Sequence, residues 1–267
     1  MTATVHRNIA TYKRGATLLL RDSLVIPTTE SSPEEKGIER TSETTVSDAA
    51  IDALGNSFER HVCMTDHKAI VRERVGQFLF EFPAGSFFQT NNSILEPLTS
   101  YVRDGVLGTP GSPPTYLVDA YCGSGLFAIT LSPHFSRIAG VEISTDSIRY
   151  AQHNASLNGV PEGKCAFHAG QAEAIFDSVK DFPPAQTVVV IDPPRKGCDI
   201  AFMDQLIAFG PATVVYISCN VHTQARDVGI MLKRSTGPAE YKLESLRGFD
   251  LFPQTAHVES VAVLRKL

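Results

Sequence analysis

The sequence predicts an α/β fold in which a mostly parallel β-sheet carries helices on both faces. Two observations predict it. From residue 115 onward, short apolar runs alternate with helical stretches, which is typical of parallel strands joined by crossover helices. The chain has 267 residues, of which 43% are hydrophobic, enough for one large domain and a smaller part.

The expected strands are the apolar runs at 116–120, 138–141, 187–191 and 213–217, a final run at 255–264, and a weaker candidate near 165–168. The expected helices are 92–103, 125–131, 145–158, 201–209 and 223–233. Ahead of them, Phe78, Phe80 and Phe82 alternate with other residues and predict strands between 71 and 82. Ligands of such sheets bind at the carboxyl ends of the strands, so the residues there are the site candidates.

The first 80 residues are less regular. A short apolar stretch at 17–21 predicts a strand, and the segment at about 27–52, rich in Ser, Thr and Glu, predicts a mobile polar loop. We therefore expect residues 1–80 to be the remnant of a larger domain and residues 81–267 to form the sheet-containing domain.

Composition excludes several classes of protein. The net charge of −5 gives no overall basic field, which counts mildly against a nucleic-acid substrate. The five cysteines form no Cys-x-x-Cys pair, so we expect no disulfide framework, metal site or iron–sulfur cluster. Reduced thiols fit an intracellular protein, whose compartment stays open. No apolar run is long enough to span a membrane, and residues 1–9 lack the apolar core of a secretory signal.

The first two strand ends indicate a nucleoside cofactor. Asp119-Ala-Tyr-Cys-Gly-Ser-Gly125 opens a helix, and its glycines would let the backbone approach a ligand, although a plain tight turn is an equal interpretation. Glu142 follows the next strand, where a carboxylate can accept hydrogen bonds from ribose hydroxyls. Asp119 would repel a pyrophosphate, so the pair points to S-adenosylmethionine rather than a dinucleotide.

The third strand end is Asp192-Pro-Pro-Arg195, where the prolines stiffen the turn and aim Asp192 into the strand-end crevice. A surface turn is the alternative interpretation. Amino-methyltransferases that act on adenine or cytosine tend to have Asn-Pro-Pro-aromatic in this place. The acid and Arg195 therefore argue against methylation of an exocyclic amine.

Cys219 and Glu259 are the candidates for chemistry. Cys219 ends a strand just before a helix, where the helix N-terminus favours the nucleophilic thiolate, although most free cysteines are merely small buried hydrophobes. Glu259 lies within the last apolar run. A carboxylate there is either at a sheet edge or a functional group with a raised pKa.

Five motifs in this order resemble the RNA uracil-C5 methyltransferase family, above all its eukaryotic tRNA branch that makes ribothymidine. They are Phe-Pro-Ala-Gly-Ser-Phe-Phe-Gln-Thr-Asn (82–91), the motif at 119–125, Asp-Pro-Pro-Arg-Lys-Gly (192–197), Ser-Cys-Asn (218–220) and His-Val-Glu (257–259). The resemblance implies a Rossmann-like, class I S-adenosylmethionine-dependent methyltransferase domain after part of a central domain. Proline often follows Ser-Cys-Asn in the family, whereas this chain has Val221, and the chain is too short for the family's N-terminal RNA-binding barrel.

The resemblance also implies roles for single residues and a reaction. Cys219 would be the nucleophile that adds to C6 of uracil and Glu259 the base that removes the C5 proton. The residues implied to hold S-adenosylmethionine are Gln89, Tyr121, Glu142 and Asp192. Phe87 would stack on the extruded base, and a basic rim for RNA phosphates is expected from Arg195, Lys196, Arg226 and Arg247. The expected substrate is the T-loop uridine of tRNA, acted on by a monomer.

Two other functions stay open at this stage. An RNA cytosine-C5 methyltransferase also uses a strand-end cysteine, but it usually has a Pro-Cys pair in the loop that here holds Asp192, and it would leave Glu259 without a task. A non-catalytic RNA-binding or RNA-folding protein with a relic site is the second. Whether Gln171 or Glu173 contacts adenine is also open.

Overall fold

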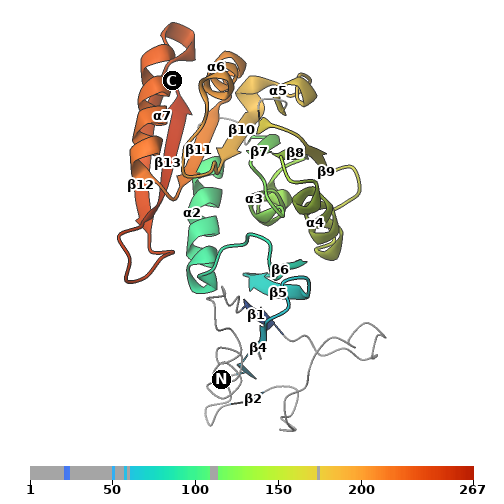
Figure 1. Ribbon diagram of the computed structural model, residues 1–267. Coiled ribbons are helices and arrows are strands. Elements are labelled where there is room, and N and C mark those ends of the chain that lie inside the picture. Colours follow the sequence, from blue (N-terminus) through green and yellow to red (C-terminus); the bar gives the residue numbers. More distant parts are fainter. Residues whose placement is uncertain (1–20, 25–49, 52–56, 59–60, 109–113, 173–174) are drawn as a thin grey trace. The chain divides into compact units, whose positions relative to one another are not determined.

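The computed structural model describes residues 21–24, 50–51, 57–58, 61–108, 114–172 and 175–267 (Figure 1). They fall into two compact units, residues 1–72 with 83–86, and residues 73–82 with 87–267. The domain boundary near residue 80 stays a prediction. Most of the segment expected to be mobile, and all but Arg21 of the strand expected at 17–21, lie outside the described residues.

The smaller unit contains short antiparallel pairs. Strand β1 (Arg21–Leu24) pairs with β4 (His61–Met64), and β2 (Ala50–Ile51) pairs with β3 (Ser57–Phe58). The hairpin of β5 (Ile70–Val75) and β6 (Phe78–Pro83) follows and passes into the larger unit.

Seven of the described strands form the sheet of the larger unit, in the order β12-β13-β11-β10-β7-β8-β9. All neighbours are parallel except that β13 runs antiparallel to both β11 and β12, which confirms the mostly parallel sheet. The strands are β7 (Tyr116–Ala120), β8 (Arg137–Glu142), β9 (Cys165–Ala169), β10 (Thr187–Ile191), β11 (Thr213–Ser218), β12 (Tyr241–Phe249) and β13 (Glu259–Lys266).

Helices cover both faces of this sheet because its buried strands are apolar on both sides (Figure 1). On β11, Val214 and Tyr216 join the core beneath one helix layer, whereas Val215 faces α2, where Gly105 approaches it closely. The helices are α2 (Leu95–Leu107), α3 (Leu126–Thr130), α4 (Thr145–Leu157), α5 (Ile175–Ser178), α6 (Ile200–Phe209) and α7 (Val221–Arg234). In the described part, no helix has both the length and the hydropathy to cross a bilayer.

The C-terminal strands differ from the expectation. Strand β12 was not predicted, because most of its residues are exposed and polar at a sheet edge and give no apolar alternation. The last strand begins at Glu259 instead of residue 255, because residues 255–258 form an exposed loop. Since β13 lies between β11 and β12, Glu259 is not on an edge strand, and that interpretation was wrong.

Helix α4 fixes the segment that precedes the sheet. Asn154 Oδ1 and Asn158 Oδ1 accept the backbone N–H groups of Glu81 and Leu79, both at 2.8 Å. The ring of Phe82 stacks on that of Phe88 with centroids 4.3 Å apart. Strand β6 therefore places residues 87–89 at the carboxyl end of the sheet.

Candidate active site

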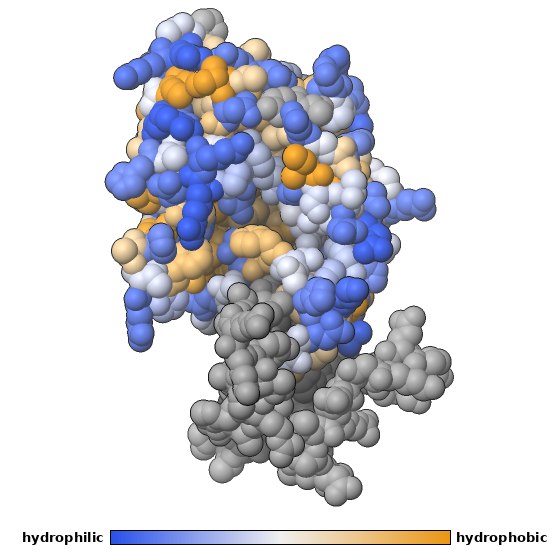
Figure 2. Space-filling model, in the orientation of Figure 1, coloured by the Kyte–Doolittle hydropathy of each residue, from blue (hydrophilic) through white to orange (hydrophobic). Residues whose placement is uncertain are grey.

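One cavity of about 790 Å³ opens at the carboxyl ends of the strands. Its size is typical of a small-molecule site. The predicted site residues that line it are Phe87, Gln89, Tyr121, Glu142, Asp192, Arg195, Cys219 and Glu259. Figure 2 shows one face of the molecule, on which hydrophobic residues surround a hollow bordered by hydrophilic ones.

The turn after β7 exposes its backbone to the cavity. Tyr121, Gly123 and Gly125 all have left-handed backbones, with φ of 67°, 52° and 92°. Because the φ of Gly125 is +92°, a side chain there would be strained, and a Cβ would also lie 2.8 Å from Ile129 Cδ1, so glycine is favoured at this position. Glu142 accepts the N–H of Gly123 at 3.3 Å through one carboxylate oxygen. The glycine turn and Glu142, paired on sequence grounds, are thus in contact.

Asp119 lies beneath this turn and does not line the cavity. It is fully buried, and its Oδ2 accepts the N–H of Ala128 at 2.8 Å, which ties the turn to the first residues of α3. Its Oδ1 has no hydrogen-bond partner among the described residues. Burial raises the pKa of Asp119 to about 7, and the nearby Glu142 adds to the rise.

Asp192 follows β10 directly, is half-buried as a residue and lines the cavity. Burial raises its pKa well above the usual value, and the charges of Glu259 and Asp119 raise it further. Two other acids at this end of the sheet, Glu259 and Asp119, therefore disfavour the negative charge of Asp192.

Cys219 and Asn220 are the only residues between β11 and α7. Asn220 caps the helix by accepting the N–H of His222, and its own N–H is held by Ser218 Oγ at 3.1 Å. Cys219 thus stands at the cavity wall in a short turn that the hydrogen bonds of Ser218 and Asn220 hold in place.

The pKa of the Cys219 thiol is raised, whereas the sequence had led us to expect a thiol that ionises readily. Burial is the largest cause, followed by the charges of Glu259 and Asp192. Arg195, which lines the same cavity, opposes them because its positive charge favours the thiolate. The expectation considers the helix end alone, whereas burial and the acids that the fold brings near act in the opposite direction.

Glu259 is the first residue of β13 and is only 1% exposed. Its Oε1 is buried without a hydrogen-bond partner in the described part of the chain. Burial raises its pKa to about 7. A carboxylate that is not held by other groups and titrates near neutrality is suited to accept a proton.

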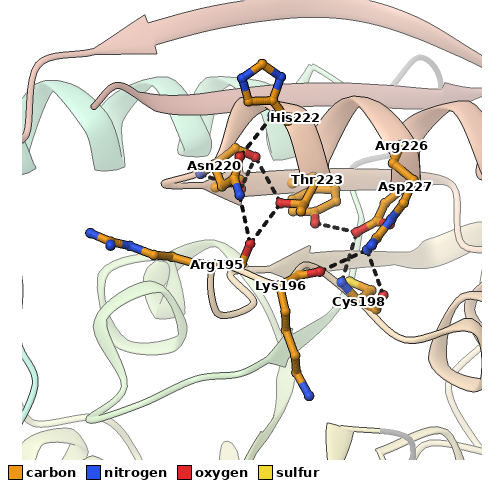
Figure 3. Close-up of polar contacts among 10 residues, drawn as sticks. Arg195, Lys196, Cys198, Asn220, His222, Thr223, Arg226 and Asp227 are labelled. Atoms are coloured by element: carbon orange, nitrogen blue, oxygen red, sulfur yellow. Dashed lines mark hydrogen bonds and ion pairs between the residues drawn. The ribbon is translucent and has the colours of Figure 1, made fainter. Parts of the chain in front are cut away.

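Several outcomes concern residues at the margin of the site. Arg226 does not line the cavity; its guanidinium binds Asp227 and the loop after β10 (Figure 3).

Gln171 lines the cavity, whereas Glu173 lies outside the described residues. Phe252 also lines it and was missed, since an aromatic residue in a loop before the last strand gave no distinctive signal. Among the described residues, no cluster of three or more His, Cys, Asp or Glu could hold a metal ion.

Comparison with known proteins identifies the family. The family model described as tRNA (uracil-5-)-methyltransferase matches residues 38–267. The chain belongs to this family.

Two fungal members of the tRNA (uracil-5-)-methyltransferase family are highly similar. A tRNA (uracil(54)-C(5))-methyltransferase of Schizosaccharomyces pombe is 49% identical over 261 residues, which is 96% of this chain and 43% of that protein. Its counterpart in Saccharomyces cerevisiae is 46% identical over 265 residues, or 96% and 41%. The chain thus spans less than half the length of these curated relatives.

A solved structure confirms the class I S-adenosylmethionine-dependent methyltransferase fold. The tRNA (uracil-54, C5)-methyltransferase of Pyrococcus abyssi, in complex with S-adenosyl-L-homocysteine, superposes with a TM-score of 0.60 at 27% identity. The match covers 82% of this chain and 48% of that one.

Proposed function

We propose that this protein methylates C5 of a uridine in RNA, with S-adenosylmethionine as methyl donor and uridine 54 in the T-loop of tRNA as target. The observation that carries the proposal is the meeting of Cys219 and Glu259 at one cavity, at the ends of adjacent antiparallel strands. The names of the fungal relatives support the tRNA substrate.

The cavity suits S-adenosylmethionine. The left-handed turn at 121–125 leaves backbone open to a ligand, and the Glu142 carboxylate beside it can accept hydrogen bonds from both ribose hydroxyls. Gln89, Tyr121 and Asp192 line the same cavity and complete the proposed binding set. The cofactor supplies an electrophilic methyl group on a sulfonium.

The proposed reaction assigns separate tasks to Cys219 and Glu259. The Cys219 thiolate adds to C6 of uracil, and the electron pair moves into the ring as an enolate with carbanion character at C5. C5 would then form its bond to the methyl carbon while the bond from that carbon to the sulfonium sulfur breaks, and its electron pair stays on sulfur in S-adenosylhomocysteine. Glu259 accepts the remaining C5 proton, the C5–C6 double bond re-forms, and the thiolate leaves.

RNA binding is proposed at the mouth of the cavity. Phe87 is 79% exposed although it lines the cavity, so its ring can stack on a base that has left its helix, a step that costs a few kcal/mol. Arg195 and Lys196 are exposed at the same mouth and are placed to contact phosphates. Arg247 instead lies over the rings of Tyr101 and Phe249, so its phosphate contact stays a prediction, as does the monomeric state.

Nucleoside mass spectrometry tests the proposal. The full-length protein is incubated with S-adenosylmethionine and an unmodified tRNA transcript, and the digested RNA is analysed for 5-methyluridine. We expect one modified uridine per tRNA and none in a transcript with cytidine at position 54. Product in neither tRNA nor ribosomal RNA would support the relic-site alternative, and 5-methylcytidine would support the cytosine alternative.

A further inference from the structure

Side chains on one face of α7 and at its N-cap form hydrogen bonds with the backbone of the loop that follows β10 (Figure 3). The carbonyl oxygen of Arg195 accepts hydrogen bonds from Asn220 Nδ2 at 3.0 Å and Thr223 Oγ1 at 3.2 Å. Arg226 Nη2 donates to the carbonyl oxygens of Lys196 at 3.0 Å and Cys198 at 3.1 Å. Residues 220, 223, 226 and 227 recur at helical spacing, so they form one continuous surface toward the loop.

Asp227 is the buried centre of these contacts. It is 0% exposed, and its Oδ2 accepts the N–H of Cys198 at 2.9 Å and the hydroxyl of Tyr216 at 2.7 Å. Its Oδ1 accepts Arg226 Nε at 2.8 Å. Hydrogen bonds to a charged group are the stronger ones, so this carboxylate fixes strand β11, the loop and Arg226 relative to one another.

Gly197 makes the close approach possible. Its φ is +76°, and a Cβ there would lie 2.5 Å from Asp227 Oδ2 and 2.6 Å from Arg226 Nη2. The loop therefore presses its backbone directly onto the two charged groups. We call Thr223, Arg226 and Asp227, with their contacts to residues 195–198, the loop clamp.

The loop clamp connects two parts of the cavity wall. The loop carries Arg195, and α7 begins two residues after Cys219. The charged groups that act on the Cys219 thiol and line the same cavity are Glu259 from β13 and Asp192 and Arg195 from the loop. Arg195 is the cation in this set, and its backbone is fastened to Asn220, the neighbour of Cys219.

We propose that the loop clamp is a positioning device that holds Arg195 against Cys219, so that the thiolate forms beside a fixed positive charge. The proposal rests on the proposed function and deepens it. In this proposal Arg226 holds the loop after β10 in place, instead of contacting an RNA phosphate as the sequence predicts. The residues of the loop clamp are positioning residues, since they act on Cys219 through Arg195.

The first arm of the test measures the thiol itself in the full-length protein. The rate of Cys219 alkylation by iodoacetamide is followed against pH by peptide mass spectrometry, in wild type and in Arg226→Ala. Loss of the loop clamp should move the midpoint upward by about half a pH unit or more, because a displaced charge no longer stabilises the thiolate. Arg234→Ala is the matched control, since Arg234 is on the same helix and equally exposed but pairs with Asp204 of α6.

The second arm measures turnover. In Arg226→Ala we expect kcat for methylation to fall about tenfold or more while KM for S-adenosylmethionine stays within about twofold, because small displacements at a reacting centre are costly. Thr223→Val should act in the same direction, and Thr223→Ser, which keeps the hydroxyl, should restore the wild-type pH profile.

The outcomes separate this proposal from the proposed function. Wild-type alkylation profiles in both Arg226→Ala and Thr223→Val would overturn the loop clamp. So would an Arg226→Ala variant in which only KM for tRNA rises and the salt dependence of binding weakens, since that result assigns Arg226 to phosphates. A wild type that methylates no RNA would refute the proposed function, while the alkylation arm would still decide the loop clamp.

Discussion

Cys219 and Glu259 lie opposite each other, one step beyond the last paired residues of two neighbouring antiparallel strands. The antiparallel ladder of β11 and β13 ends with Ser218 paired to Ser260, and the next residues along the two strands are Cys219 and Glu259. Cβ atoms opposite each other across such a ladder are about 5 Å apart. The register of one strand pair therefore places a thiol and a buried acid at the same end of the sheet, and the proposed chemistry depends on it.

Replacing Cys219 by alanine should abolish methylation and leave cofactor binding intact. The thiol is the proposed nucleophile, and loss of a nucleophile typically lowers kcat on the order of a thousandfold or more. Product formation and S-adenosylhomocysteine binding are measured by mass spectrometry and calorimetry. Cys63→Ala, at an exposed cysteine, is the control and should keep full activity. Turnover by Cys219→Ala would exclude this residue as the nucleophile.

Glu259→Gln should accumulate a covalent protein–RNA adduct. An amide cannot accept the C5 proton, so the thiolate is not released after methyl transfer. The adduct would appear as a band of reduced mobility on a denaturing gel, and nuclease digestion should remove the shift. Glu162→Gln, at an exposed surface position, should form no such band. Free methylated RNA at the wild-type rate would assign proton removal to another group.

The stability of Glu259→Gln should depend on pH differently from that of the wild type. The pKa of Glu259 is about 7 in the folded protein and 4.5 in an unperturbed chain. The folded state thus holds the proton more tightly, so the free energy of unfolding falls as pH rises from about 4.5 to about 7.

Removing this titration should make the variant more stable relative to wild type at pH 8 than at pH 4.5. Between pH 4.5 and pH 8, the difference in free energy of unfolding between variant and wild type should change by about 2–3 kcal/mol, since one pKa unit corresponds to about 1.36 kcal/mol. Urea unfolding at both pH values measures it. Asp119, whose pKa is also raised, is present in both proteins, so its contribution cancels in the difference between their free energies of unfolding. An equal stability difference at both pH values would contradict the raised pKa.

Gly125→Ala should destabilise the protein more than Gly76→Ala. Both glycines have positive φ, which costs an alanine about 1–2 kcal/mol. At Gly125 the new Cβ would also lie 2.8 Å from Ile129, whereas at Gly76 it meets nothing within 4 Å. We expect losses of about 3 and 1 kcal/mol, measured by urea unfolding. Equal losses would show that the Gly125 turn is not tightly packed.

The features of the fold and of the candidate site that depend on local sequence could be predicted. Strand–helix alternation follows from side-chain periodicity, and the acids and the cysteine at strand ends can be identified because parallel strands carry their carboxyl ends to one edge. Strand β12 could not be predicted, since an exposed edge strand needs no apolar pattern.

The α/β class, the family resemblance and the predicted residues of the cavity wall follow from the amino-acid sequence alone, because each depends on local pattern and motif order. Three features emerge only in the folded chain: Glu259 is buried on an inner strand, Asp119 lies beneath the glycine turn, and Arg226 binds a loop. The folded structure also raises the pKa of Cys219. Burial and charge proximity depend on residues far apart in the chain, and those distances exist only in the folded molecule.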